Sequence, residues 1–279
     1  MKQHRLREGD VTAVDTKTAL TTVGSDTAPG SLFVPQNMTH ITKVRVAASE
    51  NFAAATSFSG FIRLEGTGMS GGPQSLAVIA GGVPVATGGN GVSKVVEYTV
   101  NFPVVAGNII EVYGEMCGTD IGGCTFVVGL EFSDKPNDGD DEHKTLTVEG
   151  DLTSADTRTA LLTQGSISSP TLAVPAGYTK LVKLGVAAAA EGLADGKAGF
   201  IVRVGGNAVQ GGEQIFPISA AGRIAPQAGS DSAPQKAEAS IWENLDIVVS
   251  PSDTISFWGE MVGDDIGTGR MVVTAIFAK

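Results

Sequence analysis

The chain has 279 residues, 42% hydrophobic and 18% charged, a composition that excludes both a disordered chain and a membrane-spanning helical bundle. Its formal net charge of −11 argues against a protein that wraps nucleic acid, because neutralising phosphates requires an excess of Lys and Arg. Two cysteines are too few for a disulfide scaffold, and no apolar run approaches the roughly 18 residues of a spanning helix.

The first ten residues, MKQHRLREGD, are the one locally basic stretch. No apolar run follows them, so we predict no signal peptide and a protein made in the cytosol. We interpret this stretch as a solvated tail, with an arm that touches a genome or a membrane as the alternative.

Short runs rich in Val, Ile, Thr and Phe, separated by many of the 37 glycines and 12 prolines, predict β-strands joined by turns. The first half of the chain contains about eight such runs, near 11–23, 31–35, 41–48, 58–66, 75–80, 94–103, 108–116 and 124–132. Helical periodicity is rare. Only AAAAEGLADGKAG, at 187–199, has the composition for a turn or two of helix, and its glycines disfavour even that.

The second half of the chain repeats the first. The matches keep their order, with a shift of 140 to 145 residues, and include GDVTAVDTKTAL (9–20) with GDLTSADTRTAL (150–161), GFIRLEG (60–66) with GFIVRVG (199–205), and GGPQ (71–74) with GGEQ (211–214). An acidic stretch with Pro and Gly, SDKPNDGDDEH, separates the copies and is typical of a surface linker. We therefore predict domains at 1–136 and 144–279, joined by an acidic linker at 137–143.

Eight short strands in each copy predict a two-sheet sandwich, and the jelly roll is the commonest eight-stranded form. The predicted fold class is all-β, a tandem duplication of two eight-stranded antiparallel β-sandwiches, or double jelly roll. Periodicity alone leaves an immunoglobulin-like sandwich open, although the Cys…Trp…Cys pattern of that fold is missing.

A pair of twin segments closes the two copies: YGEMCGTDIGGC at 113–124 and WGEMVGDDIGTG at 258–269. Alternation predicts a buried face on each side of the turn, made in the first copy of Ile110, Val112, Gly114 and Met116, then Phe126, Val128, Leu130 and Phe132. We interpret each twin as a hairpin of the last two strands. Cys117 and Cys124 flank the first turn and would be close enough to pair if oxidised.

The same alternation places Tyr113 with Glu115, and Trp258 with Glu260, on the polar face of their strands. Large aromatic side chains on a polar face predict a contact surface, so these four residues are interface candidates. In the alternative, each ring is capped by a loop of its own domain.

Two carboxylate pairs, Glu115 with Asp120 and Glu260 with Asp265, have the chemistry for general acid–base catalysis. Each pair recurs in both copies, whereas an enzyme needs one working site, so the repetition favours a structural role in the turns. No nucleophile, zinc or phosphate-loop motif is present. We predict that the protein is not an enzyme.

Clustered carboxylates in GDDIG, at 263–267, and in NDGDDEH, at 137–143, are oxygen ligands of the kind that calcium accepts. Neither stretch matches the spacing of an EF-hand loop. We predict that no cofactor is needed, and calcium held by Asp264 and Asp265 is the alternative.

Two related eight-stranded sandwiches in one acidic chain without an active-site motif resemble the double jelly-roll major capsid proteins of the adenovirus-like lineage of icosahedral viruses. The resemblance covers the whole chain and rests on the tandem repeat, its length and its strand count, with no diagnostic sequence motif. The chain is compact for that family and has little room for tall surface towers.

The resemblance implies a structural capsid protein that forms homotrimers and assembles with neighbouring capsomers. In that family three chains place six similar sandwiches in a pseudo-hexagonal tile of an icosahedral shell, because trimer symmetry combined with an internal repeat approximates six-fold packing. It also implies a place in the virion, assembly in the host cytoplasm, and contacts with minor capsid proteins or an internal membrane through the basic N-terminus. Sequence-specific binding of nucleic acid is not expected.

The alternative function is a tandem carbohydrate-binding or adhesin-type sandwich protein, in which Tyr113 and Trp258 would form an aromatic patch. The lack of a secretion signal and an aromatic content of 6% argue against it. A third interpretation, a glycoside-processing enzyme on a jelly roll, lacks an asymmetric carboxylate pair.

Overall fold

A computed structural model describes residues 1–21, 31–50, 56–83, 93–118, 123–137, 141–164, 167–168, 172–190, 196–223, 238–264 and 269–279. The regular elements in these ranges are all strands: β1 (Lys2–Val11), β2 (Thr18–Ala19), β3 (Leu32–Phe33), β4 (His40–Glu50), β5 (Thr56–Glu65), β6 (Gln74–Val83), β7 (Ser93–Pro103), β8 (Ile109–Gly118), β9 (Cys124–Ser133), β10 (His143–Leu152), β11 (Thr159–Ala160), β12 (Thr163–Gln164), β13 (Ile167–Ser168), β14 (Lys180–Ala190), β15 (Gly196–Gly205), β16 (Gln214–Arg223), β17 (Glu238–Trp242), β18 (Ile247–Val248), β19 (Ser256–Gly263) and β20 (Gly269–Ala278). Among the residues of these ranges, no helix is long and apolar enough to cross a membrane.

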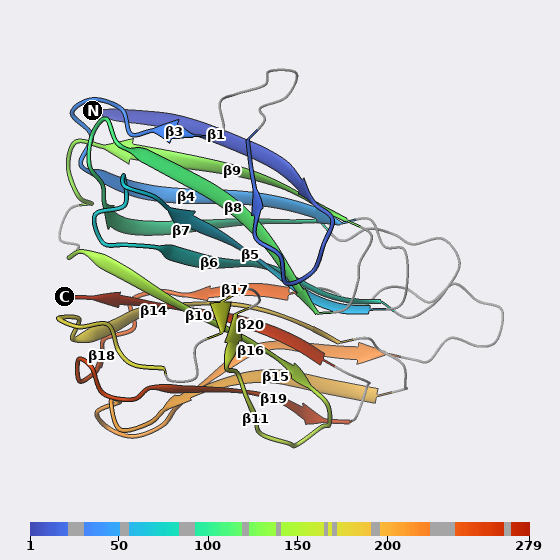
Figure 1. The fold of residues 1–279 in the computed structure, drawn as a ribbon. Helices are drawn as coiled ribbons and strands as arrows, with labels where there is room; N and C mark the ends of the chain where they lie inside the picture. The colour runs from blue at the N-terminus through green and yellow to red at the C-terminus, as the bar shows by residue number, and fades with distance from the viewer. Residues whose placement is uncertain are drawn as a thin grey trace.

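The strands form four main sheets, two from each repeat (Figure 1). Sheet I has the strand order β1-β9-β4-β7, and sheet II has the order β2-β8-β5-β6. The second repeat has the same orders, β10-β20-β14-β17 in sheet III and β11-β19-β15-β16 in sheet IV. In chain order, the strands named in these four orders alternate between the two sheets of their repeat except at one hairpin, and the first strand pairs with the last. This is the strand order of a jelly roll, and the chain is therefore a double jelly roll.

The predicted closing hairpins are wrong, although their buried faces are confirmed. β8 lies in sheet II and β9 in sheet I, and β19 and β20 are separated in the same way. The inner faces of the two strands meet across the core instead of pairing edge to edge: a Cβ on Gly114 would lie 3.0 Å from the ring of Phe126. The predicted inward side chains other than Gly114 are at most 2% exposed: Ile110, Val112, Met116, Phe126, Val128, Leu130 and Phe132.

The loops that follow β1 and β10 explain why the Gly-Glu-Met segment occurs twice. The amide of Asp15 donates to the carbonyl oxygen of Met116 at 2.7 Å, and that of Asp156 donates to Met261 at 2.6 Å. Both Asp residues have a positive φ, 50° and 51°, which Asp tolerates better than most residues. The repeated sequences are therefore two sides of one structural contact made once in each repeat.

The basic N-terminal stretch is a strand, so its interpretation as a solvated tail is wrong. Lys2 to Val11 pair residue by residue with Ser133 to Cys124 of β9. The tail interpretation failed because charged side chains lie on both faces of β1, Lys2 and His4 on the exposed face and Arg7 buried on the other, and interrupt the apolar alternation expected of a strand.

The last strand of the first repeat ends at Ser133, and β10 begins at His143. His143, placed in the linker by the sequence prediction, thus opens a strand. The side chain of Asn137 donates hydrogen bonds to the carbonyl oxygens of Thr42 and Val100 at 3.2 and 2.7 Å, which attaches the start of the linker to the first repeat. Lys2 is the register partner of Ser133, and His143 that of Ala278, so the two ends of each repeat lie side by side.

The four sheets are stacked in numerical order. Apolar cores fill the space between sheets I and II and between sheets III and IV. β5 and β6 of sheet II also pack against β10, β14 and β20 of sheet III, so the two jelly rolls dock face to face (Figure 1). Sheets I and IV are left as the outer layers.

Candidate functional site

The contact between sheets II and III has a small apolar centre. Its members are buried side chains from both repeats: Phe61, Ala77, Ala80 and Cys117 from the first, and Ala187, Ala189 and Val272 from the second. Alanines on both sides let the two sheets approach closely.

Threonine hydroxyls of sheet III satisfy the outer edge of β6, the edge strand of sheet II. The amide of Ala77 donates to Thr274 Oγ1 at 2.8 Å, and the amide of Ser75 donates to Thr145 Oγ1 at 2.8 Å. The hydroxyl of Thr147 donates to the carbonyl oxygen of Ser75 at 3.0 Å. Side chains of the second repeat thus take the place of a further strand, which leaves this edge closed to other partners.

A buried ion pair joins the same two sheets. Arg270 Nη2 lies 2.8 Å from Glu149 Oε2, with side chains 8% and 2% exposed, and Ser59 Oγ of the first repeat donates to the same carboxylate at 2.7 Å. Arg270 Nη1 also contacts Asp151 at 2.7 Å. Because a buried charge is tolerated only when it is paired and hydrogen-bonded, this network fixes how the repeats align.

Tyr98 and Gly185 fit together at the edge of the contact. The hydroxyl of Tyr98 is buried and donates to the carbonyl oxygen of Ala77 at 2.7 Å. A Cβ on Gly185 would lie 2.2 Å from that hydroxyl oxygen, so only glycine leaves room for the ring.

Glu115 and Glu260, both predicted interface residues, make the same ion pair in different surroundings. Arg63 Nε donates to Glu115 Oε2 at 2.8 Å, and these side chains are 4% and 0% exposed. Arg203 Nε donates to Glu260 Oε2 at 2.8 Å, and these side chains are 22% and 13% exposed. The first pair lies on the face of sheet II that meets sheet III, whereas the second lies on the outer face of sheet IV.

Tyr113 and Trp258, the other predicted interface residues, are each covered by a cation of their own repeat. Lys17 Nζ lies 4.3 Å from the ring centroid of Tyr113, and the guanidinium of Arg158 lies 3.7 Å from that of Trp258. Burial and a hydrogen bond to Glu111 raise the pKa of Tyr113 to about 12. These cation–π contacts use the ring faces that a stacked ligand would need.

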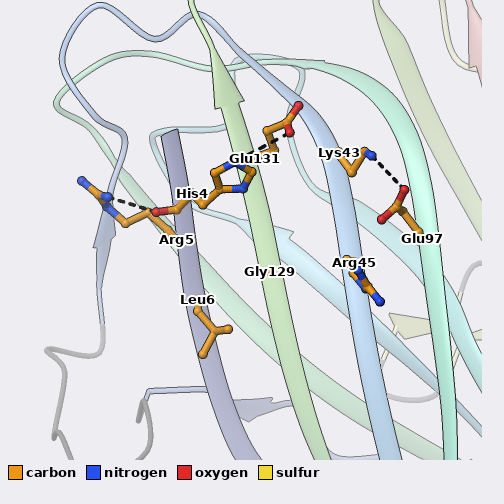
Figure 2. Close-up of a pocket in the computed structure, with 8 residues that line it drawn as sticks. All are labelled: His4, Arg5, Leu6, Lys43, Arg45, Glu97, Gly129 and Glu131. Carbon is orange, nitrogen blue, oxygen red and sulfur yellow. Dashed lines mark hydrogen bonds and ion pairs between the residues drawn. The ribbon is translucent and has the colours of Figure 1, made fainter. Parts of the chain in front are cut away.

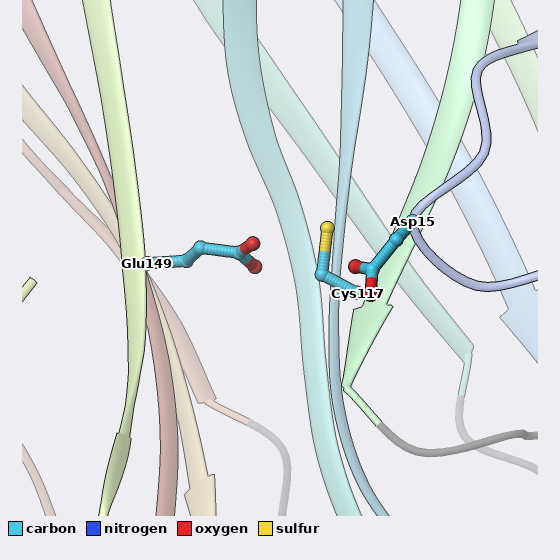
Figure 3. Close-up of side chains that lie close together, drawn as sticks. All are labelled: Asp15, Cys117 and Glu149. Atoms are coloured by element: carbon cyan, nitrogen blue, oxygen red, sulfur yellow. The ribbon is translucent and has the colours of Figure 1, made fainter. Parts of the chain in front are cut away.

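Asp15, Cys117 and Glu149 bring three candidate ligand atoms within 4.8 Å of one another. Figure 3 shows them converging from the loop after β1, from β8 and from β10. Glu149 already binds the Arg270 guanidinium, and burial followed by the Glu149 charge raises the pKa of the Cys117 thiol, which favours its protonated, poorly ligating form. The donor set fits a hydrogen-bonded contact between the repeats better than a metal centre.

Of the predicted calcium ligands, Asp264 directly follows β19. Asp264 is exposed, and Asp265 lies outside the described residues, as does Asp120. The calcium site therefore stays a prediction. Cys117 and Cys124 are both buried free thiols.

The outer face of sheet I carries a groove of about 440 Å³ (Figure 2). Leu6, Gly129 and Arg45 form one row across three neighbouring strands, and the row continues to Glu97 of β7. Leu6 is 38% exposed, and Gly129 contributes no side chain between its two neighbours. His4, Arg5, Lys43 and Glu131 complete the lining.

The outer face of sheet IV presents apolar side chains to solvent. Ile215 is 51% exposed and Val262 is 38% exposed, and Pro217 is exposed beside Ile215 on β16. Arg203 links Glu260 to Glu213, and Glu213 also pairs with Arg158 above Trp258. The face thus combines an apolar ridge along β16 with a neutralised network of charges.

The interface between the repeats was not predicted from the sequence, although a comparison of the two copies contains its signal. The covered strands of the second repeat differ from their counterparts at the contact rows: Thr145, Thr147 and Thr274 stand at the positions of His4, Leu6 and Gly129. Hydroxyls replace an exposed, partly apolar row where the neighbouring repeat packs.

No protein-family model matches the chain, and no curated protein matches it. Among solved structures, the chain is similar to the STIV major capsid protein, with 12% identity, 98% of this chain and 97% of that chain covered, and a TM-score of 0.38. It is similar to the major capsid protein P2 of bacteriophage PM2, with 10% identity, 100% of this chain and 98% of that chain covered, and a TM-score of 0.35. It is also similar to PNGF-II, with 9% identity, 98% of this chain and 66% of that chain covered, and a TM-score of 0.47. Two of these three are viral major capsid proteins.

Proposed function

We propose that this protein is a structural major capsid protein, whose homotrimers form pseudo-hexagonal tiles of an icosahedral viral shell. The observation that carries the proposal is the face-to-face docking of the two jelly rolls within one chain. A chain built in this way is a pair of similar blocks, and three such chains supply the six blocks of a tile.

The composition of the interface between the repeats supports a role in assembly. Its apolar centre, threonine contacts and buried ion pair show that this jelly roll is able to use a sheet face as a docking surface. Each chain still has two outer sheets, and both expose large apolar side chains, Leu6 and Val95 on sheet I and Ile215 and Val262 on sheet IV. Such side chains on two opposite faces favour association with further copies.

The proposed shell would be assembled in the host cytoplasm and would contact minor capsid proteins or an internal membrane through the basic residues of β1. Lys2, His4 and Arg5 are exposed on that strand. Because β1 is part of sheet I, the test neutralises charge without deleting the strand: Lys2→Gln, outside the groove on sheet I, should weaken binding to anionic vesicles. Unchanged binding would remove the membrane contact from the proposal.

The carbohydrate-binding alternative receives no support from the aromatic residues on which it depends. The rings of Tyr113 and Trp258 are covered by Lys17 and Arg158, so neither offers an open platform for a sugar. Glycan binding by a monomer would nevertheless favour that alternative over the shell.

The native mass of the purified protein, measured by size-exclusion chromatography with light scattering, tests the proposal. We expect three times the chain mass of 28.5 kDa, or a particle built from such units. A monomer that persists across protein concentration and salt would overturn the shell function. If the mass is that of a trimer or of a larger particle, electron microscopy should show tiles with six similar blocks.

A further inference from the structure

The internal interface provides a template for the contact between copies. Within the chain, the edge strand β6 of sheet II lies on the row Thr147–Thr274–Gly185 of sheet III. The counterpart of that row in the first repeat is Leu6–Gly129–Arg45, which lines the groove on sheet I (Figure 2). The groove therefore lies at the position where, in the other repeat, a neighbouring strand is seated.

The counterpart of β6 is β16, at the edge of the outer sheet IV. The two strands keep the same register: Phe61 pairs with Ala77, and Ile201 pairs with Pro217, each beside the same irregularity. Ser75 and Ala77 of β6 thus correspond to Ile215 and Pro217 of β16. These are the exposed apolar residues on the ridge of sheet IV.

We propose that the β16 ridge of one copy, Ile215 and Pro217, docks into the Leu6–Gly129–Arg45 groove on sheet I of the next copy. This inference rests on the proposed function and names the surfaces by which its trimer forms. The contact is heterologous, because each chain carries one ridge and one groove, and its repetition closes a ring of three chains when each copy is rotated by a third of a turn from the last.

The sizes of the facing residues change together. Inside the chain, the small side chains of Ser75 and Ala77 face the threonines of sheet III. In the proposed contact, the large Ile215 and Pro217 face a row whose centre is Gly129, which has no side chain. At the centre of the contact, Ala77 on Thr274 is replaced by the larger Pro217 on Gly129, so a bigger residue on the ridge meets a smaller one in the groove.

The hydrogen-bonding groups change together as well. The amide of Ala77 requires the acceptor Thr274 Oγ1, at 2.8 Å. Pro217 has no N–H group, and Gly129, at the place of Thr274, offers no hydroxyl. The donor and its acceptor are absent from the same contact, so docking would leave no polar group unsatisfied at this point. At the next position Leu6 stands in place of Thr147 and places an apolar side chain opposite Ile215, while the hydroxyl that Thr147 gives to the carbonyl oxygen of Ser75 has no counterpart there.

Two variants each remove one side of the contact. Ile215→Asp places a charge on the ridge, and Gly129→Phe fills the groove. A Cβ on Gly129 would meet no atom closer than 3.7 Å, so the substitution is compatible with the folded chain. Val105→Asp is the matched control, because Val105 is 42% exposed in the turn between β7 and β8, away from both surfaces.

Light scattering should show a trimer for the natural sequence and for Val105→Asp, and monomers for Ile215→Asp and Gly129→Phe at the same concentration. Circular dichroism and thermal unfolding should show that all the monomeric variants are folded. An equimolar mixture of the two variants should form a species of two chains that grows no further, because one intact groove then meets one intact ridge.

The outcomes separate this inference from the function on which it rests. A natural chain that is oligomeric, with both variants oligomeric too, would overturn the assignment of the surfaces and leave the shell function standing. Monomeric variants that form no pair on mixing would show that the ridge of one copy does not bind the groove of another. That result would also overturn the assignment of the surfaces. A natural chain that stays monomeric under all conditions would overturn both.

Discussion

Replacement of Arg63 and of Arg203 by methionine compares one ion pair in two environments. Both arginines donate Nε to a glutamate at 2.8 Å, yet Glu115 is 0% exposed and Glu260 is 13% exposed. Loss of one partner from a buried pair costs about 3–5 kcal/mol, because the remaining charge is left in a poorly solvated place. Loss from a solvated pair costs about 0.2–1 kcal/mol.

These costs predict different shifts in the melting temperature. At about 2–4 °C per kcal/mol for domains of this size range, Arg63→Met should lower the melting temperature of the first repeat by roughly 6–20 °C. Arg203→Met should lower that of the second repeat by about 4 °C at most. Calorimetry follows both repeats, and fluorescence follows the second alone, since both tryptophans, Trp242 and Trp258, lie there.

The comparison should be made on dilute, monomeric protein, for which the outer face of sheet IV is in water. Equal shifts for the two variants would refute the argument that burial by sheet III sets the cost. In an assembled sample the cost of Arg203→Met should rise toward that of Arg63→Met, if sheet IV is covered there.

Three further predictions concern the interface between the repeats. Burial, with a smaller effect of Lys183, lowers the pKa of His143 from 6.5 to about 4. The unfolded chain therefore binds this proton at a higher pH than the folded chain, and stability should fall by up to about 3 kcal/mol between pH 6.5 and 4. Gly185→Ala should cost about 1–3 kcal/mol or more, because the new Cβ would overlap Tyr98. Cys117 should resist thiol reagents in the folded protein, because burial and the nearby Glu149 raise its pKa.

Each of these predictions has a control. For His143→Gln, denaturant unfolding should show a weaker dependence on pH in that range, and an unchanged dependence would assign the effect to other groups. Gly129→Ala, in an open position, should leave the melting temperature of the monomer unchanged, in contrast to Gly185→Ala. Urea should expose Cys117 and Cys124 to the reagent together, whereas rapid labelling without denaturant would contradict the buried position of Cys117.

The sequence predicted the architecture of each repeat because alternating apolar residues report burial directly. The inward faces of β8 and β9 were correct for this reason. Their pairing was not, because alternation is the same whether two strands lie side by side or face each other across a core. The segments after the two Gly-Glu-Met sequences were therefore predicted to be hairpin turns, whereas the strands on either side of each segment lie in different sheets.

Other differences arose where tertiary contacts override local pattern. The segment from Ala187 has helical composition but forms part of β14, where Ala187 and Ala189 provide the small side chains that pack against sheet II. β1 was missed because polar residues occupy both faces of this edge strand, including the buried Arg7. The polar contacts around Glu149 and Thr274 were out of reach, since they join residues far apart in the chain and depend on how two finished sandwiches dock.

The pairing of the first and last strand of each repeat has a consequence for the way such a chain accepts added sequence. Ser133 and His143 lie at the same end of the strands as Lys2 and Ala278, and Figure 1 shows both chain ends at that side. A peptide inserted at the junction and another fused at either end would emerge on one rim of the molecule. In an assembled tile, all such additions would be displayed on the same surface, which makes the junction a place for engineered epitopes or tethers.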